Sequence, residues 1–375
     1  MSSNNRRLKT AIIGPGKVAH LHAKALQNLA ESEFTAVCGR NLTKTGEFAR
    51  QYGVEAFPDI NTMASSGVEA VIICTPHPFH RDYAVQAARS GMHVIVEKPL
   101  ASTLADCDAM IQAANDNNVQ LGTISQRRFY RPAQRIKQAI DAGKIGRPIL
   151  GTVNIYGWRD EAYYRSDPWR GSWEMEGGGV LVNQAPHQLD ILQWYMGPVE
   201  EVFGFWSNEN HPYIEVEDTA VAVLKFRNGG LGSIVVSNSQ NPALYGKVCV
   251  HGENGASIGV QTDGGQMFIA GVHTEVDPPY NDVWTVPGEE HMLEIWKQED
   301  SYFFRSVDAL TYYMERQLED FLRAIIESKK PLIDGEEGRK TVEIFTAIYR
   351  SNRDRTSVRF PLVPEAGNDA DGRLL

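Results

Sequence analysis

The sequence predicts an α/β protein with a doubly wound parallel sheet in its N-terminal part and a large, mainly antiparallel open sheet in its C-terminal part. Up to about residue 130, short apolar runs alternate with segments of helical periodicity. A glycine motif directly follows the first apolar run. Beyond that point, strand-like runs follow one another closely. We therefore expect one domain over residues 1–130 and a second α/β domain over residues 131–375.

The N-terminal part begins with LKTAII at 8–13, a short apolar run that ends in glycines and is typical of a buried strand. Apolar residues at helical spacing follow over 17–29. Strands and helices then alternate, with strands at 34–38, 68–75 and 93–98 and helices at 42–52, 79–90 and 103–117. Alternation of this kind predicts right-handed βαβ units and a parallel sheet covered on both faces.

The C-terminal part has a different pattern. A helix is expected over 131–143, a strand in GRPILGTVNIYGW from residue 146, and a glycine cluster with an apolar helix over 177–196. Strand-like runs separated by turn residues fill 199–270 and end with GGQMFIA at 264–270. Helices are expected near 301–328 and 336–352, and the acidic tail 365–375 is expected to fray.

Composition restricts the function classes. The 375 residues carry a net charge of −10 without a long block of one sign, which argues against a nucleic-acid partner. The sequence contains no stretch of about 20 apolar residues, so no membrane span is expected. The four cysteines form no C-x-x-C pair, so we expect buried free thiols and a cytoplasmic protein. The histidine pairs at 20 and 22 and at 77 and 80 lack the further ligands of a zinc site, so no metal is expected.

The segment Gly14-Pro15-Gly16-Lys17-Val18-Ala19 matches G-x-G-x-x-A at the junction of a strand and a helix. The first glycine allows the tight turn, the second allows the backbone to approach a pyrophosphate, and the small third residue allows helix and strand to pack closely. The helix N-terminus offers N–H groups and a positive dipole end to the phosphates. The segment therefore predicts dinucleotide binding; the alternative is a glycine turn without a ligand.

The second strand ends without the carboxylate that would bind the ribose hydroxyls of NAD(H). Arg40 follows it instead, and its planar guanidinium can pair with the 2′-phosphate of NADP(H). We therefore expect NADP(H) to be preferred over NAD(H). In the alternative interpretation, Arg40 stacks on the adenine or points to solvent.

Polar residues follow two further strands of the predicted sheet. Ligands of doubly wound sheets lie beyond the carboxyl ends of the strands. Lys98 follows the apolar run HVIV, and partial burial would lower its pKa toward a range useful for proton transfer or hydroxyl polarisation; otherwise it is a surface lysine. The residues expected at the cofactor crevice are Thr75, Pro76, His77, His80, Glu97 and Lys98.

A second candidate group surrounds the glycine cluster. Asn183 and His187 are four residues apart and lie on one helical face. Histidine exchanges protons near neutral pH, although a packing role fits the spacing equally well. In the aromatic and arginine-rich stretch upstream, Trp169 could stack on a ring and Arg170 could bind hydroxyls or phosphate, so we assign both to the cofactor site. The alternative is a surface loop held by its tryptophans.

These motifs together resemble the Gfo/Idh/MocA family of sugar and inositol oxidoreductases. The motifs that carry the resemblance are the glycine loop at 14–19, CTPHPFH at 74–80, EKP at 97–99, QRRF at 126–129 and GGGVLVNQAPHQLD at 177–190. The resemblance implies a Rossmann domain followed by an α/β domain whose open sheet usually mediates homodimers or homotetramers. It also implies catalytic roles for Lys98, His187 and the position of Asn183. From the same resemblance, we expect Gln126 to contact the cofactor. The residues expected to contact the substrate are Lys98, Arg128, Tyr156, Asn183 and His187.

The family often has aspartate where this chain has Asn183, which cannot carry a negative charge but can orient a hydroxyl. We expect an NAD(P)-dependent dehydrogenase or reductase that moves a hydride between nicotinamide and a carbinol or keto carbon of a sugar, glycoside or cyclitol. His187 would take the hydroxyl proton while Lys98 stabilises the developing alkoxide. Two alternatives are a sugar oxidoreductase that recycles a tightly bound cofactor and a non-enzymatic NAD(P) sensor.

Overall fold

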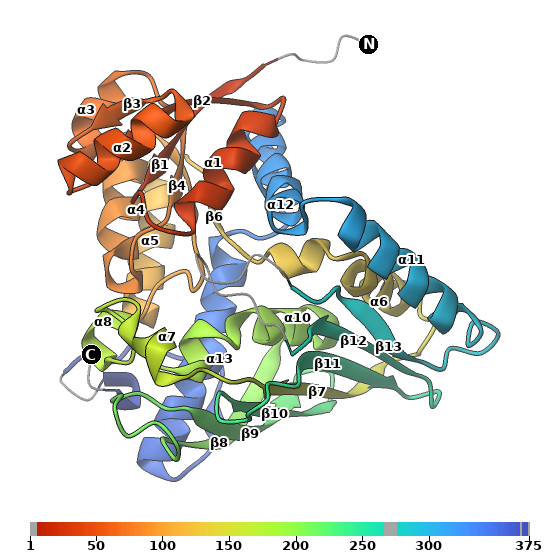
Figure 1. Cartoon of the computed structure of the whole chain (residues 1–375). Coiled ribbons are helices and arrows are strands. Elements are labelled where there is room, and N and C mark those ends of the chain that lie inside the picture. Colours follow the sequence, from red (N-terminus) through yellow and green to blue (C-terminus); the bar gives the residue numbers. More distant parts are fainter. Residues whose placement is uncertain (1–5, 266–275, 368–369, 374–375) are drawn as a thin grey trace. The chain divides into compact units, whose positions relative to one another are not determined.

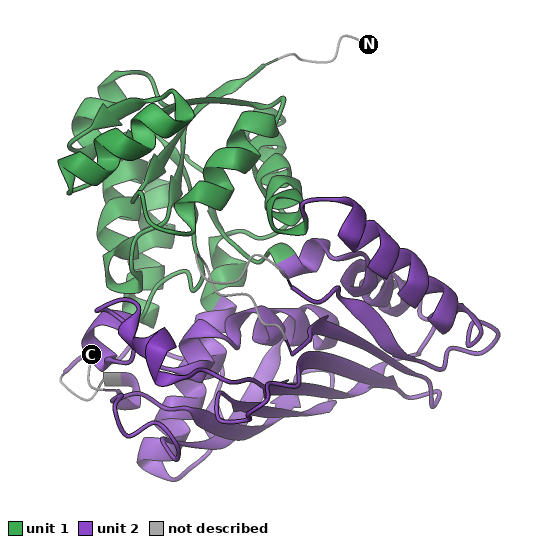
Figure 2. Cartoon of the chain, in the orientation of Figure 1, with its two compact units in different colours: residues 1–126, 309–339 green, residues 127–308, 340–375 purple. Residues whose placement is uncertain are grey.

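The computed structural model describes residues 6–265, 276–367 and 370–373, and the chain divides into two compact units. One unit comprises Met1–Gln126 with Ala309–Arg339, and the other comprises Arg127–Asp308 with Lys340–Leu375 (Figure 2). The chain first leaves the N-terminal unit at residue 126, near the division expected at 130. It returns at Ala309, so the uninterrupted second domain expected over 131–375 is not what the structure contains.

The first unit contains a parallel sheet, as the sequence predicts; it has six strands, of which β3 and β6 were not expected. Its strands β1, β4 and β5 are almost wholly buried, which explains their continuous apolar character. The strand order is β3-β2-β1-β4-β5-β6, so the chain builds the sheet outward in one direction from β1 and in the other direction from β4, as in doubly wound nucleotide-binding sheets. The strands are β1 (Leu8–Ile13), β2 (Ser32–Cys38), β3 (Glu55–Phe57), β4 (Ala70–Ile73), β5 (His93–Val96) and β6 (Leu121–Thr123).

The helices of this unit follow the strands in turn, except the last, which returns from far along the chain. Helix α12 lies beside α1 (Figure 1), and its residues Met314, Leu318 and Phe321 join the same hydrophobic core as β1. The long helix expected near 301–328 is in fact two helices, because the chain is extended at Val307. The helices of this unit are α1 (Ala19–Asn28), α2 (Leu42–Tyr52), α3 (Ile60–Ser65), α4 (His80–Arg89), α5 (Leu104–Asp116) and α12 (Ala309–Ile326), with the 3₁₀ turn η1 (His77–Phe79).

The second unit is built on an eight-stranded sheet of order β13-β12-β11-β7-β10-β9-β8-β14. Strands β7 and β10 are parallel and the other neighbouring strands are antiparallel, which confirms the predicted mainly antiparallel sheet. The strands are β7 (Pro148–Tyr156), β8 (Val199–Ser207), β9 (Thr219–Phe226), β10 (Leu231–Ser237), β11 (Tyr245–Gly252), β12 (Ser257–Asp263), β13 (Tyr280–Trp284) and β14 (Val358–Arg359).

Helix α10 covers one face of this sheet. A Cβ atom added to Gly151 would lie 2.7 Å from side-chain atoms of Leu192 and Met196 of α10, so the helix packs directly on β7. Within the glycine cluster and apolar helix expected over 177–196, Pro186 begins α10, because proline is tolerated in the first turn of a helix, and the short helix α9 precedes it. The remaining helical elements of this unit are η2 (Gln126–Phe129, which starts at the unit boundary), α6 (Arg131–Asp141), α7 (Glu161–Arg165), α8 (Trp173–Glu176), α9 (Val180–Asn183), α10 (Pro186–Met196), α11 (Met292–Ser306), α13 (Gly335–Asp354, whose first residues belong to the first unit) and η3 (Ala370–Gly372).

The other face of the sheet exposes apolar side chains. Strand β9 alternates strictly, with Ala222 and Leu224 buried and Val221 and Val223 exposed. The register places Phe205 of β8 directly opposite Val221. The uncovered side of the sheet therefore displays a row of large apolar residues.

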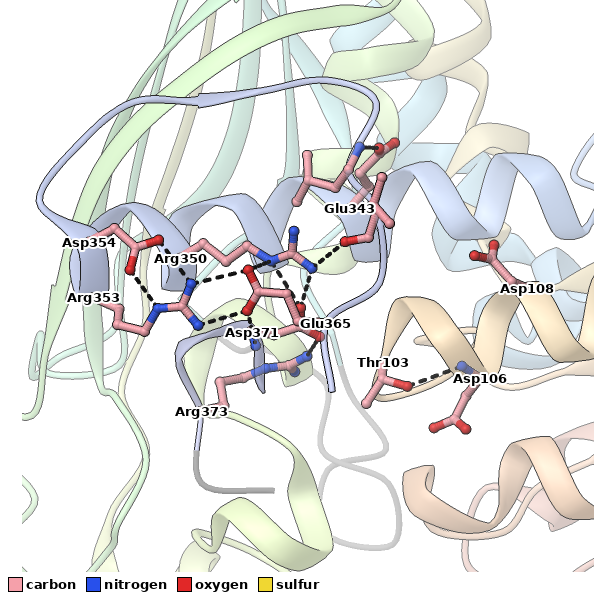
Figure 3. A network of polar contacts seen from close by, with 12 residues as sticks. Thr103, Asp106, Asp108, Glu343, Arg350, Arg353, Asp354, Glu365, Asp371 and Arg373 are labelled. Atoms are coloured by element: carbon pink, nitrogen blue, oxygen red, sulfur yellow. Dashed lines mark hydrogen bonds and ion pairs between the residues drawn. The ribbon is translucent and has the colours of Figure 1, made fainter. Parts of the chain in front are cut away.

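The tail expected to fray is held in place where the structure describes it. Arg350 of α13 donates hydrogen bonds to Asp371, and Arg353 donates to Glu365 (Figure 3). Arg373 is buried and donates to the carbonyl oxygen of Gly177 at 2.8 Å. The expectation of fraying is therefore wrong for these residues, because charged tail residues find buried partners. Most of the strand-like run expected at 264–270 lies outside the described residues.

Two expectations from composition can be compared with the fold. Within the described ranges, no helix is long and apolar enough to cross a membrane. The four cysteines are buried and form no disulfide, as the sequence predicts.

Candidate active site

The glycine loop brings three backbone segments of the first unit close together. Gly14 follows β1 with φ +94°, a conformation that favours glycine. An added Cβ would lie 2.9 Å from Cγ2 of Thr75 and 3.1 Å from the carbonyl of Cys74 at the end of β4. A side chain at position 14 would therefore occupy the space at the carboxyl ends of β1 and β4, where doubly wound sheets bind nucleotides.

The helix after this loop has an open N-terminus. Val18 precedes α1 without a capping side chain, and the first turn of α1 contains no acidic residue. The free N–H groups and the positive end of the helix dipole therefore favour an anion. The buried hydroxyl of Thr75 has no hydrogen-bond partner among the residues that the structure describes. Loop, helix end and hydroxyl together fit the pyrophosphate of a dinucleotide.

The end of β2 carries a cation rather than a carboxylate. The exposed Arg40 stacks on the ring of Phe79, with its guanidinium carbon 4.6 Å from the ring centroid. The neighbouring Asn41 accepts a hydrogen bond from the N–H of Lys44 and so caps α2. Gly39, Arg40 and Asn41 thus offer no carboxylate to a ribose, as the sequence predicts.

Glu97 at the end of β5 is part of a buried ion pair. Its carboxylate accepts a hydrogen bond from Nε2 of His22 in α1 at 2.7 Å and one from the N–H of Lys98 at 3.1 Å. Burial by itself raises the pKa of Glu97, but the hydrogen bond and charge of His22 and the charge of Lys98 outweigh it and lower the pKa. The Glu97 carboxylate therefore holds the backbone of Lys98 and faces His22 of α1. From the sequence it was expected at the cofactor crevice instead.

His80 joins the segments that follow β4 and β5. Its ring is fully buried, with Nε2 2.9 Å from the carbonyl oxygen of Thr75 and Nδ1 3.0 Å from that of Pro99. The peptide bond between the half-buried Lys98 and Pro99 is cis. Since both ring nitrogens face backbone carbonyls, His80 supports the loop that presents Lys98 and is poorly placed for the direct cofactor contact predicted for it.

In the second unit, His187 lies in the first turn of α10 and is buried. One turn further, Asp190 accepts two hydrogen bonds from Arg128, at 2.7 and 2.6 Å. Arg128 is 1% exposed and its guanidinium also faces the ring of Trp194. Arg128 is therefore suited to hold α10, and with it His187, and its burial does not support the substrate contact expected of it.

Asn183 ends α9, whereas His187 lies in α10, so the two residues do not belong to the single helix face that was expected from the sequence. The amide nitrogen Nδ2 of Asn183 donates to the carboxylate of Glu176 and to the hydroxyl of Tyr163, the latter at 3.2 Å. Arg170 donates to the same hydroxyl at 2.5 Å. The structure thus brings Asn183 and Arg170 together through Tyr163.

The two rings beside Arg170 extend this cluster. The guanidinium carbon of Arg170 lies 4.2 Å from the ring centroid of Tyr163 and 4.5 Å from that of Trp169. Burial raises the pKa of Tyr163 despite the charge of Arg170, so the phenol keeps its proton near neutral pH.

The glycine turn before α9 is packed against Glu217. An added Cβ at Gly179 would lie 1.8 Å from the carbonyl oxygen of Glu217, so the backbones meet where only glycine fits. The Glu217 carboxylate accepts hydrogen bonds from the N–H groups of Gly179 and Leu181, each at 2.9 Å, and from the hydroxyl of Tyr349 at 2.8 Å. Burial raises the pKa of Glu217 to about 7.

Tyr156 lies on the face of the sheet opposite α10. Side chains alternate along a strand, and Gly151, which packs against α10, has the opposite parity to Tyr156 on β7. The ring of Tyr156 instead contacts Tyr245, and its hydroxyl lies 3.4 Å from Asn154. The substrate contact expected of Tyr156 is therefore not supported on the α10 side of the sheet.

Several site residues escaped sequence reasoning. Glu176, Tyr163, Glu217 and His22 bond to or support the predicted residues, yet no spacing rule identifies them. The position of Glu176 directly before three glycines is the one usable signal, because charged residues are rare in buried turns. Gln126, expected at the cofactor, is half-buried at the end of the first unit. Within the described part of the chain, no group of three or more histidines, cysteines and carboxylates could hold a metal ion.

Comparisons with known proteins agree with this arrangement. Residues 8–124 match the oxidoreductase family with an NAD-binding Rossmann fold, and residues 133–258 match the GFO/IDH/MocA C-terminal domain. The chain is 28% identical over 364 residues to myo-inositol 2-dehydrogenase of Thermotoga maritima, covering 94% of this chain and 98% of that protein. It is 27% identical over 242 residues to scyllo-inositol 2-dehydrogenase (NAD⁺) of Bacillus subtilis, covering 62% of this chain and 68% of that protein.

A solved structure is similar over nearly the whole chain. The WlbA dehydrogenase from Bordetella pertussis, in complex with NADH and UDP-GlcNAcA, superposes with a TM-score of 0.83 and 29% identity. The similarity covers 96% of this chain and 100% of that chain.

Proposed function

The chain belongs to the Gfo/Idh/MocA family of NAD-binding oxidoreductases, and on that premise we propose that it moves a hydride between a nicotinamide dinucleotide and a carbinol or keto carbon of a sugar, glycoside or cyclitol. The observation that carries the proposal is the glycine loop, where Gly14 leaves space at the ends of β1 and β4 next to the uncapped α1. When bound there, the cofactor supplies the acceptor or donor of the hydride.

The protein's own residues handle the proton and the charge. In the oxidative direction, His187 accepts the proton of the substrate hydroxyl, since imidazole exchanges protons near neutral pH. The ammonium of Lys98 stabilises the negative charge that develops on the substrate oxygen. Glu97 and His80 fix the segment that carries Lys98, and the Arg128–Asp190 ion pair fixes the helix that carries His187. Reduction uses the same groups in reverse.

The substrate class is supported by two observations. Full-length similarity to a myo-inositol dehydrogenase and to a dehydrogenase crystallised with UDP-GlcNAcA favours a polyhydroxylated ring. Near Asn183, the cluster of Tyr163, Trp169 and Arg170 offers aromatic faces and hydrogen-bond donors suited to sugar hydroxyls or to a nucleotide. We favour a sugar or sugar nucleotide over a simple cyclitol.

The cofactor preference rests on Arg40. An exposed guanidinium where NAD-specific chains place a carboxylate favours the 2′-phosphate of NADP(H). The dehydrogenase from Bordetella pertussis was crystallised with NADH, so kcat/KM must be compared for both cofactors. A higher kcat/KM with NAD⁺ than with NADP⁺ would rule out the preference that we propose.

We also propose that the chain forms homo-oligomers through the uncovered face of the eight-stranded sheet. Large apolar side chains on that face, among them Phe205, Val223 and Leu231, are 46%, 57% and 57% exposed. Contiguous apolar residues at a protein surface mark interaction sites.

The experiment that tests the proposed activity presents a panel of sugars, glycosides, inositols and sugar nucleotides with NAD⁺ and NADP⁺ separately. Absorbance at 340 nm reports formation of the reduced cofactor. We expect a signal with one class of polyol, which would identify class, cofactor and direction together. If no member of the panel gives a signal in either direction and the purified protein carries no cofactor, the proposal is wrong. Cofactor that co-purifies without net reduction would indicate internal redox recycling instead.

A further inference from the structure

We propose that Glu176 is a positioning residue for this activity: its buried carboxylate orients the side-chain amide of Asn183 so that the carbonyl oxygen Oδ1 accepts a hydrogen bond from a substrate hydroxyl. The inference rests on the proposed function and deepens it, because it assigns a chemical class to the substrate group that binds at Asn183. All the residues involved belong to the second unit.

Glu176 is the last residue of α8 and is 1% exposed. One carboxylate oxygen accepts the N–H of Gly171 at 2.6 Å, and the other accepts Nδ2 of Asn183. The group of Asn183 that faces this carboxylate is the amide nitrogen, which is a donor and therefore matches a carboxylate oxygen as acceptor. The contact therefore determines which way round the amide lies.

The second hydrogen of that nitrogen is also engaged. Nδ2 of Asn183 lies 3.2 Å from the hydroxyl of Tyr163, which Arg170 and Gln184 also approach as donors, at 2.5 and 3.3 Å. With both hydrogens directed at Glu176 and Tyr163, the amide turns its oxygen away from them. A side chain that is otherwise ambiguous between donor and acceptor is thereby restricted to accepting at its other end.

This geometry predicts the chemistry of the bound group. Oδ1 accepts from a hydroxyl but repels a carboxylate, a phosphate or a keto oxygen, none of which carries a hydrogen. The hydrogen bond to Glu176 also polarises the amide and strengthens Oδ1 as an acceptor. An aspartate at position 183 would instead place two carboxylates in hydrogen-bond contact, and only one of them could ionise readily.

The groups around Glu176 include tyrosines, arginines and other carboxylates. Tyr163 and Tyr164 of α7 and Tyr349 of α13 all interact electrostatically with Glu176, and burial raises the pKa of each phenol. The phenols therefore stay neutral near pH 7. The nearby cations include Arg170, which donates to Tyr163, Arg159, which faces the Tyr163 ring, and Arg373, which donates to the carbonyl oxygen of Gly177. Further acidic groups are Glu217, which lies next to Tyr349, and Asp167, which pairs with Arg170 at 3.4 Å.

The test exchanges the two groups in the full-length protein, using the substrate found by the panel. In Glu176→Gln the amide of Asn183 can take either orientation, so kcat/KM should fall about 10- to 100-fold, chiefly through KM for the substrate, while KM for the cofactor is unchanged. In Asn183→Asp two carboxylates meet, and kcat/KM should fall as pH rises. The double variant carries Glu176→Gln and Asn183→Asp together. In it the new amide at position 176 donates to the new carboxylate at position 183 while still accepting from Gly171, so kcat/KM at pH 8 should exceed that of both single variants.

The matched control is Glu174→Gln, which makes the same change at an exposed position of the same helix and should leave kcat/KM unaltered. If kcat/KM of the double variant at pH 8 does not exceed that of Glu176→Gln, the proposal is overturned. Glu176 would then serve only as the hydrogen-bond acceptor for the N–H of Gly171. Unchanged kcat/KM in Glu176→Gln would also overturn the proposal. Both results require an active wild type, whereas a silent wild type overturns the proposed function itself and this inference with it.

Discussion

Glu217 is a buried carboxylate whose protonation bears on the stability of the second unit. Burial raises its pKa from about 4.5 to about 7, against the hydrogen bonds that it accepts from Gly179, Leu181 and Tyr349. Between these two values the folded state retains a proton that the unfolded state has lost, so the contribution to stability falls as pH rises and levels off above about 7. The full difference is about 3 kcal/mol.

We expect the free energy of unfolding to decrease by about 3 kcal/mol more in the wild type than in Glu217→Gln between pH 4.5 and pH 8. Urea denaturation of both proteins at several pH values measures this difference. Glu174→Gln serves as the control, since it alters an exposed glutamate. Parallel pH profiles for wild type and Glu217→Gln would mean that Glu217 is already ionised in the folded protein at pH 4.5.

At the scale of elements, the short helix α9 depends on its glycine turn. A Cβ at Gly179 would overlap the carbonyl oxygen of Glu217, so Gly179→Ala must displace the start of α9 and, with it, Asn183. We expect a loss of about 3 kcal/mol in unfolding free energy and a large loss of kcat/KM for the substrate. The matched control is Gly46→Ala within α2, where the nearest atom lies at 3.7 Å and alanine should be neutral or stabilising. Equal thermal stability of the two variants would contradict the close approach at Gly179.

Sequence periodicity predicted β1, β2, β4 and β5 and the helices α1, α2, α4 and α5, but it did not predict β3, α3 or β6, which are only three to six residues long. Several helices also have a side-chain cap at their start. Asn41, Asp59 and Thr103, for example, cap α2, α3 and α5. Periodicity did not separate α11 from α12, since the break at Val307 carries no glycine or proline. Whether a helix such as α12 rejoins an earlier core depends on tertiary packing, which local pattern does not encode.

The candidate site was predictable where function imposes a motif and unpredictable where partners come from distant segments. Gly14, Lys98, Asn183 and His187 lie in contiguous motifs. The buried partner of Arg128 is 62 residues away, and that of Glu97 is 75 residues away. The face on which Tyr156 lies could not be predicted, because alternation along β7 assigns faces only once α10 is known to pack on Gly151.

At the scale of the whole molecule, the uncovered sheet face should govern assembly. Val223→Glu places a charge in the apolar row of β9, so an oligomer formed through that face should dissociate. Light scattering coupled to size-exclusion chromatography measures the mass. Leu42→Glu is the control, because Leu42 is 65% exposed on α2, which belongs to the first unit and not to this sheet. A monomeric wild type, or an unchanged mass in Val223→Glu, would exclude this face as the interface.

The most direct test of the central claim measures turnover and cofactor binding together in Lys98→Ala and His187→Ala. If the two residues handle charge and proton while the glycine loop holds the cofactor, kcat should fall by about 10²- to 10⁴-fold in each variant. The cofactor Kd, from quenching of protein fluorescence, should stay within about twofold of the wild type, as it should in the exposed-lysine control Lys44→Ala. Near-wild-type kcat in either variant would contradict the catalytic role assigned to that residue.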